Sequence, residues 1–101
     1  MDTQLKKGAL DMCVLSVLGK KDYYGYELVQ KISKYIQITE GTLYPILRRL
    51  KNEGYLQTYL KESSEGPSRK YYSLTSLGKT KSKELKIEWK EFQAKINKII
   101  I

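Results

Sequence analysis

The chain has 101 residues, enough for one small domain. Its net charge of +8 indicates either a polyanionic partner or a surface whose lysines serve solubility. It contains no histidine and one cysteine, which excludes a histidine-dependent catalytic triad and a cysteine-based zinc site. No glycine-rich phosphate loop and no paired acidic residues are visible. We therefore expect no enzyme, no metal and no cofactor.

The sequence also predicts where the protein resides. Its first residues lack the apolar run and cleavage site of a signal peptide, and no stretch approaches the ~20 apolar residues that span a bilayer. Cys13 has no partner for a disulfide and lies in an apolar run, so we expect a small core residue. These features predict a cytoplasmic protein without membrane contact.

Two helices are predicted in the first third of the chain. Residues 5–18 are rich in apolar side chains and predict a largely buried helix, which ends in a turn at Gly19. A second, amphipathic helix follows the tyrosine-rich residues 23–26. Gly25 near its start leaves backbone N–H groups accessible, so we expect Tyr24 and Gly25 to bind a DNA phosphate, although these tyrosines could equally be packed. The apolar stripe of this helix is Leu28, Val29, Ile32 and Ile36.

Residues 39–55 predict a short helix that is central to the chain. The Thr39 hydroxyl can cap its start, and Gly54 suits a left-handed position after its end. Pro45 lies beyond the first turn, so the helix either kinks or begins later, near Thr42. The inward-facing residues recur at helical spacing, at Leu43, Ile46, Leu47 and Leu50.

The opposite side of this central helix is basic and aromatic. Arg48 lies there, flanked by Arg49 and Lys51. Such a face suits a helix in a DNA major groove, and it also suits an ordinary amphipathic helix with a solvated basic face. The residues of this helix that we expect to contact DNA are Thr42, Tyr44, Pro45 and Arg48.

After the central helix the apolar pattern changes to a period of two. Residues 56–60 alternate as in a half-buried strand, residues 63–68 have the composition of a loop, and residues 69–74 predict a second strand. Arg69 and Lys70 stand in this second strand, where we expect them to hold the DNA backbone. Three helices followed by a basic hairpin is the order of a winged helix-turn-helix.

Residues 75–101 predict a last helix, with Thr75 as its cap. Its apolar residues follow spacings of 4, 3, 4 and 3, which indicates packing along another helix. We expect this helix to pack both on its twofold mate in a homodimer and on the first helix of its own chain. The expected dimer-interface residues are Leu85, Trp89, Phe92, Ile96 and Ile99.

Trp89 is the only tryptophan. Near a twofold axis, two such rings could hold a planar apolar or cationic compound, with Phe92 beside them. The alternative is that Trp89 only fills the dimer interface.

Three segments together resemble the PadR family of bacterial transcriptional regulators. They are YYGYEL at residues 23–28, GTLYPILRRLKNEGYL at residues 41–56 and GPSRKYYSLTSLGK at residues 66–79. They cover nearly the whole chain in family order and spacing.

The resemblance implies a mainly α fold with a small β-hairpin, in which residues 1–74 form a winged helix-turn-helix and residues 75–101 a dimerisation helix. It implies a repressor that binds palindromic double-stranded operators as a homodimer. The single C-terminal helix is similar to the compact branch of the family, where a tryptophan matching Trp89 stacks on flat drugs in multidrug sensing.

A competing interpretation is a winged-helix module that binds protein instead of DNA. That class would show an apolar or acidic outer face on the central helix. The face here is basic and polar, which favours nucleic acid; it carries Arg48, Arg49, Lys51 and Asn52.

Overall fold

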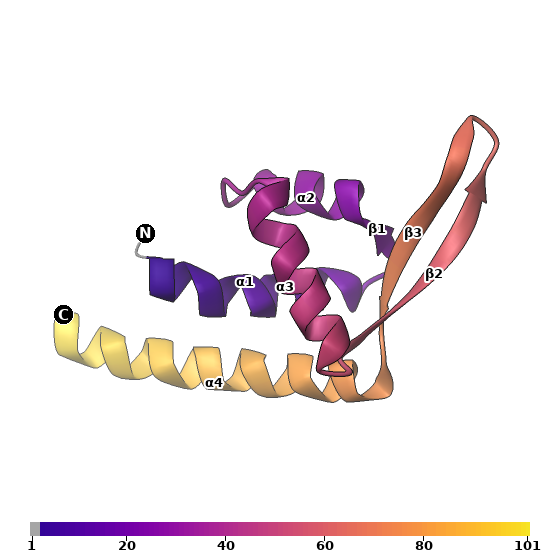
Figure 1. The fold of residues 1–101 in the computed structure, drawn as a ribbon. Helices are drawn as coiled ribbons and strands as arrows, with labels where there is room; N and C mark the ends of the chain where they lie inside the picture. Colours follow the sequence, from indigo (N-terminus) through magenta and orange to yellow (C-terminus); the bar gives the residue numbers. More distant parts are fainter. Residues whose placement is uncertain (1–2) are drawn as a thin grey trace.

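Four helices and a three-stranded antiparallel sheet form residues 3–101, the part of the chain that the computed structural model describes (Figure 1). The expected winged helix-turn-helix with a long C-terminal helix is confirmed. None of the helices in this part of the chain is long and apolar enough to cross a lipid bilayer. The elements are α1 (Thr3–Leu18), β1 (Tyr23–Tyr24), α2 (Gly25–Ser33), α3 (Glu40–Asn52), β2 (Leu56–Ser63), β3 (Gly66–Leu74) and α4 (Ser76–Ile100).

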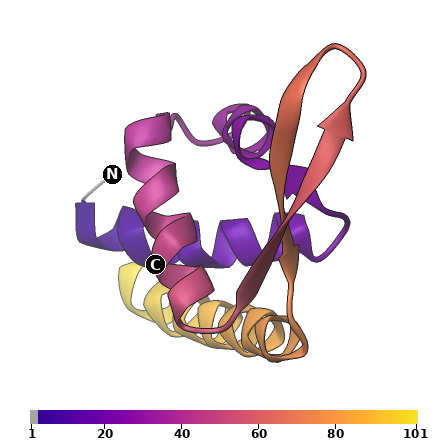
Figure 2. The ribbon, with the colours of Figure 1, turned by 45° about the vertical axis from the view of Figure 1, so that its right-hand side comes forward.

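The core forms where α1, α2 and α3 meet, with α4 and the base of the sheet packed around them (Figures 1 and 2). The predicted apolar stripe of α3 is confirmed, since all four of its residues are at most 7 % exposed. Cys13 is half-buried and lies outside the core, contrary to expectation. The side chains with no more than 1 % exposure are Leu10, Val14, Leu15, Leu28, Leu43 and Leu47.

The start of α3 differs in detail from the prediction. Thr39 occupies the N-cap position, but its hydroxyl accepts no backbone N–H and instead lies 3.3 Å from the hydroxyl of Thr42. The helix begins at Glu40, so the later start near Thr42 was wrong, and Pro45 is a true interior residue. Proline has no N–H, so the carbonyl of Gly41 loses its helical partner; Gly41 is exposed, and water can replace that bond.

The end of α3 agrees with the prediction. Gly54 has a φ of +87°, in the left-handed region that glycine adopts without strain. Its N–H donates to the carbonyl of Lys51, and the following N–H of Tyr55 donates to the carbonyl of Leu50. This turn closes the helix and leads the chain directly into β2.

The sheet has the strand order β1-β3-β2, and β2 and β3 form a hairpin that we call the wing (Figure 2). The sequence missed β1, a strand of only two residues, whose Tyr24 pairs with Tyr71. The predicted loop is shorter than expected because β3 begins at Gly66. Only the base of the wing reaches the core: Leu56 is buried, with 3 % exposure, whereas Leu60 further along β2 is 70 % exposed.

The long helix α4 runs beside α1 in the opposite direction (Figures 1 and 2). Its predicted cap is confirmed: the Thr75 hydroxyl accepts the N–H of Gly78 at 3.0 Å and donates to the carbonyl of Gly54 at 2.6 Å. The expected packing on the chain's own first helix is also confirmed, since Leu85 packs against the core cluster and lines a groove with α1.

The first turn of α4 generates a prediction about stability. A Cβ at Gly78 would collide with the backbone carbonyl of Tyr55, so Gly78→Ala should lower the free energy of unfolding by about 3 kcal/mol. Gly8→Ala is the matched control, because no described residue outside its own stretch of helix lies within 4 Å of its Cβ position and alanine favours a helix by up to about 1 kcal/mol. Urea denaturation compares the two variants. Equal stabilities would contradict the proposed close contact.

Candidate nucleic-acid interface

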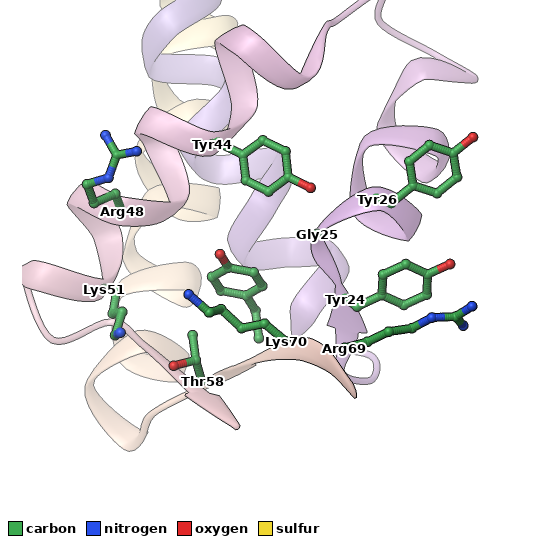
Figure 3. A pocket seen from close by; sticks show the side chains of 10 residues that line it. Tyr24, Gly25, Tyr26, Tyr44, Arg48, Lys51, Thr58, Arg69 and Lys70 are labelled. Atoms are coloured by element: carbon green, nitrogen blue, oxygen red, sulfur yellow. The ribbon is translucent and has the colours of Figure 1, made fainter. Parts of the chain in front are cut away.

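A groove of about 450 Å³ opens between the start of α2, the outer side of α3 and the wing (Figure 3). Six of the eight residues expected to contact DNA line it, while Thr42 and Pro45 lie outside it on the exposed side of α3. The sequence did not assign Tyr26, Lys51, Thr58 or Tyr72 to this site. The lining residues are Tyr24, Gly25, Tyr26, Tyr44, Arg48, Lys51, Thr58, Arg69, Lys70 and Tyr72.

Tyr44 on α3 and Gly25 at the start of α2 lie in close contact within the lining of the groove. A Cβ at Gly25 would lie 2.6 Å from Cε1 and 2.7 Å from the hydroxyl oxygen of Tyr44, so only glycine admits the ring here. Gly25 is buried, and the expectation of an accessible backbone at this residue was wrong. The ring of Tyr44 is half-buried and packs against the core cluster, which holds it in place.

Tyrosine hydroxyls are protonated at neutral pH, and two in this groove have their pKa raised further. Burial raises the pKa of Tyr44, and the carboxylate of Glu40 and the neighbouring Tyr24 raise it further. Burial also raises the pKa of Tyr72, which outweighs the lowering effect of the nearby Arg48 guanidinium. A protonated phenol donates a hydrogen bond, so both side chains are suited to an acceptor such as a phosphate oxygen.

Four cationic side chains surround these tyrosines, and no acidic residue is among the described residues that line the groove. Arg48 and Lys51 project from α3, and Lys70 extends from β3 toward them (Figure 3). All three are exposed. The groove is therefore an electropositive surface with neutral hydrogen-bond donors.

Arg69 takes a different direction from Lys70, because successive residues of a strand point to opposite faces. Its guanidinium carbon lies 4.7 Å from the centroid of the Tyr24 ring, on the outer side of the groove (Figure 3). Tyr24 in turn lies 5.7 Å from Tyr71, whose ring stacks on Tyr59 at 5.6 Å. Tyr24, Tyr71 and Tyr59 thus form a row of aromatic rings across the outer face of the sheet. Tyr24, at one end of this row, holds Arg69 at the edge of the groove.

Arg49 does not belong to the outward face, contrary to the interpretation of the sequence. Its Nη2 donates to Oδ1 of Asp11 at 2.6 Å, and its Nη1 donates to Oε1 of Glu53 at 2.8 Å. The hydrogen bond to Asp11 is the first cause, and that to Glu53 the second, of the raised pKa of Arg49. Asp11 lies 38 residues away on α1 and gave no sign of this pairing in the sequence.

A second groove, of about 370 Å³, lies between α1 and α4. Trp89 and Phe92, the expected ligand-binding residues, line it together with Leu85, while Ile96 and Ile99 do not. The α1 side of the groove consists of one glycine, one alanine and one methionine. The full lining is Gly8, Ala9, Met12, Leu85, Glu88, Trp89 and Phe92.

Comparison with known proteins decides which family this arrangement represents. The family model described as the transcriptional regulator PadR-like family matches residues 14–84, well over half of the chain. The chain belongs to the PadR-like family of transcriptional regulators. The matched residues include the whole basic groove, whereas the aromatic residues of the α1–α4 groove follow them.

Individual PadR-like relatives agree with this assignment. A PadR-like transcriptional regulator of Bacillus cereus is 36% identical, with a TM-score of 0.88 over 97% of both chains. An uncharacterized protein of Lysinibacillus sphaericus is 43% identical over 89 residues, which are 84% of this chain and 82% of the relative. Bacillus subtilis PadR in complex with operator DNA shares the fold, with 22% identity and a TM-score of 0.68 over 75% of this chain and 45% of that one.

Proposed function

We propose that this PadR-like regulator is a cytoplasmic repressor that binds a palindromic operator as a homodimer. The observation that carries the proposal is the basic groove, whose described lining combines four cations with tyrosine hydroxyls and includes no acidic side chain. In this proposal residues 1–74 bind DNA and residues 75–101 dimerise. The proposed DNA contacts are Tyr24, Thr42, Tyr44, Pro45, Arg48, Arg69 and Lys70; Gly25 is left out because its backbone is buried against the Tyr44 ring.

The outer side of α3 would enter the major groove of the operator. Arg48 would bond base edges or phosphates there, and the exposed Thr42 and Pro45 would lie along the same side of the helix. Lys70 would reach the phosphates that flank the major groove. Arg69, supported by the Tyr24 ring, would hold the backbone beside the wing.

The alternative is a winged-helix module that binds protein and not DNA. Such a module would need an apolar or acidic outer face on α3, and this face carries Arg48 and Lys51 at the groove. The complex of Bacillus subtilis PadR with operator DNA gives additional support, because it is a protein of the same fold. Both observations favour the nucleic-acid proposal.

Exposed apolar residues on α4 support the homodimer. Trp89 is 42 % exposed, Phe92 50 % and Ile99 78 %, and burying such side chains favours association. Leu85 and Ile96 are half-buried. Together with Trp89, Phe92 and Ile99 they form the apolar row of α4 that we call the seam. A twofold axis beside α4 would set two copies of α3 about 34 Å apart, the spacing of successive major grooves.

A planar small molecule bound beside Trp89 and Phe92 would release the operator. The lining of the α1–α4 groove is mostly apolar, and the carboxylate of Glu88 favours a cationic compound over an anionic one. A compound that separates the α4 helices of a dimer would change the spacing of the two copies of α3. The affinity for the operator would fall because the two states bind DNA differently.

The first test of this function removes one cation at a time. Arg48→Ala should cost roughly 1–3 kcal/mol on the protein's own promoter if Arg48 reads a base, and Lys70→Ala should weaken all sequences alike and reduce the salt slope by about 1. Lys83→Ala, which removes an equal charge from the exposed side of α4, is the control. Gel shifts at several salt concentrations measure these effects, and a wild type without any shift at low salt rules out the repressor.

The homodimer is tested by placing charge on the seam. Phe92→Asp together with Ile96→Asp should give monomers that lose the operator, because a carboxylate buried in an apolar interface is costly. Ile87→Asp is the control, since this residue is 58 % exposed and lies outside the seam. Sedimentation equilibrium distinguishes the species. A wild-type chain that remains monomeric would contradict the proposal.

The effector site is tested through the fluorescence of the single tryptophan. Planar cationic dyes should quench Trp89 in a saturable way and lower the affinity for the operator. In Phe92→Ala, which keeps the fluorophore, dye binding should weaken because one wall of the site is lost. Dyes that leave the fluorescence unchanged, or bind without affecting the operator, would leave Trp89 as packing alone.

A further inference from the structure

Two consecutive arginines of α3 have different surroundings. Arg48 is exposed at the groove, whereas Arg49, about 100° further around the helix, is engaged through both terminal nitrogens. Asp11 on α1 accepts one of these hydrogen bonds and Glu53, just after α3, accepts the other. The side chains of Arg49, Asp11 and Glu53 are 39 %, 22 % and 43 % exposed. One guanidinium therefore joins the end of α3 to another helix.

Asp11 is a fixed point for this junction. Its neighbours on α1 include Leu10, Val14 and Leu15, which are 1 %, 0 % and 0 % exposed. A close-packed core does not allow α1 to shift or rotate without disturbing these side chains. The carboxylate therefore projects from one of the most constrained segments of the described chain, as a group that positions another group should.

The last turn of α3 has particular need of such support. Pro45 removes one backbone hydrogen bond from the first half of the helix, and Gly54 turns the chain sharply into the wing. Arg49 also stabilises this turn from within. The backbone carbonyl of Arg49 accepts the N–H of Glu53 at 2.9 Å, and the guanidinium of Arg49 donates to the Glu53 carboxylate. Arg48 and Lys51, two of the groove cations, project from this turn.

Ion pairs that are this exposed add little to stability, because solvent screens the charges and two long side chains lose freedom. The planar guanidinium of arginine nevertheless fixes directions, since its two terminal nitrogens each donate to a different carboxylate. The value of the contact lies in the orientation that it imposes more than in its contribution to unfolding.

We propose that Asp11 and Arg49 form a positioning pair that sets the orientation of the last turn of α3, and hence of Arg48 and Lys51 relative to the wing. The inference rests on the proposed function, because orientation matters to binding only if the groove receives DNA. Neither residue of the pair touches the nucleic acid. Arg49 is thus a positioning residue, in contrast to its neighbour Arg48.

Two variants separate position from charge. Arg49→Lys keeps the positive charge but lacks the planar guanidinium that binds both carboxylates. Asp11→Asn keeps the size of its side chain and weakens the bond to Arg49 by removing the charge of the acceptor. In the free proteins, amide hydrogen exchange of residues 48–53 should accelerate while exchange in α1 stays unchanged. Affinity for a duplex that the wild type enriches from a random-sequence pool should fall about 3- to 30-fold, and the double variant should be no weaker than either single one.

Controls make the outcomes distinct. Affinity for a random-sequence duplex and its salt dependence should not change in Arg49→Lys, because the net charge is the same. Glu53→Gln weakens only the bond within the end of α3, because it removes the charge of the acceptor, and should have a smaller effect.

Unchanged hydrogen exchange in residues 48–53 would overturn the pair's positioning role. Loss of affinity in Arg49→Lys with full affinity in Asp11→Asn would instead make Arg49 a direct contact and also overturn it. A wild type that binds no duplex would overturn the proposed function, while hydrogen exchange of the free chain still decides the role of the pair.

Discussion

The ring of Tyr44 packs against Gly25 closer than any side chain at that position would allow. This contact brings the start of α2 against the outer side of α3. The wing meets α2 through β3 and its partner strand β1, and it meets α3 through β2. The basic groove is the space that remains between these three elements. A larger residue at position 25 would push the Tyr44 ring outward and remove one wall of the groove. The shape of the interface therefore requires glycine at this position.

Residues that are adjacent in the sequence face different parts of the molecule, because side chains turn by about 100° per residue on a helix and alternate between two faces on a strand. On α3, a step of about 100° separates Arg48 at the groove from Arg49 at α1. On β3, alternation separates Lys70, which faces α3, from Arg69, which lies on Tyr24. The 19 basic residues of the chain are therefore not all available at the interface, since Arg49 is engaged by Asp11 and Glu53.

Features encoded by local periodicity could be predicted from the sequence. The stripe of α3, the left-handed Gly54 and the cap at Thr75 each depend on residues a few positions apart, and all three are present. Features that join distant segments could not be predicted. The two residues of β1 are too few for a pattern, and the bond from Arg49 to Asp11 spans 38 residues. For the same reason, individual groove residues on α2, α3 and β3 could be predicted from the sequence, but not that they line one common groove.

The central claim is that the groove between α2, α3 and the wing receives duplex DNA. Nuclear magnetic resonance of the isotope-labelled chain, titrated with a duplex selected from a random pool, tests it most directly. The account predicts that the largest changes in chemical shift fall on residues of the groove, including Tyr44, Arg48 and Lys70, while the exposed side of α4 near Ile87 changes little. Changes confined to α4 and the α1–α4 groove, with the signals of α3 and the wing unaltered, would contradict it.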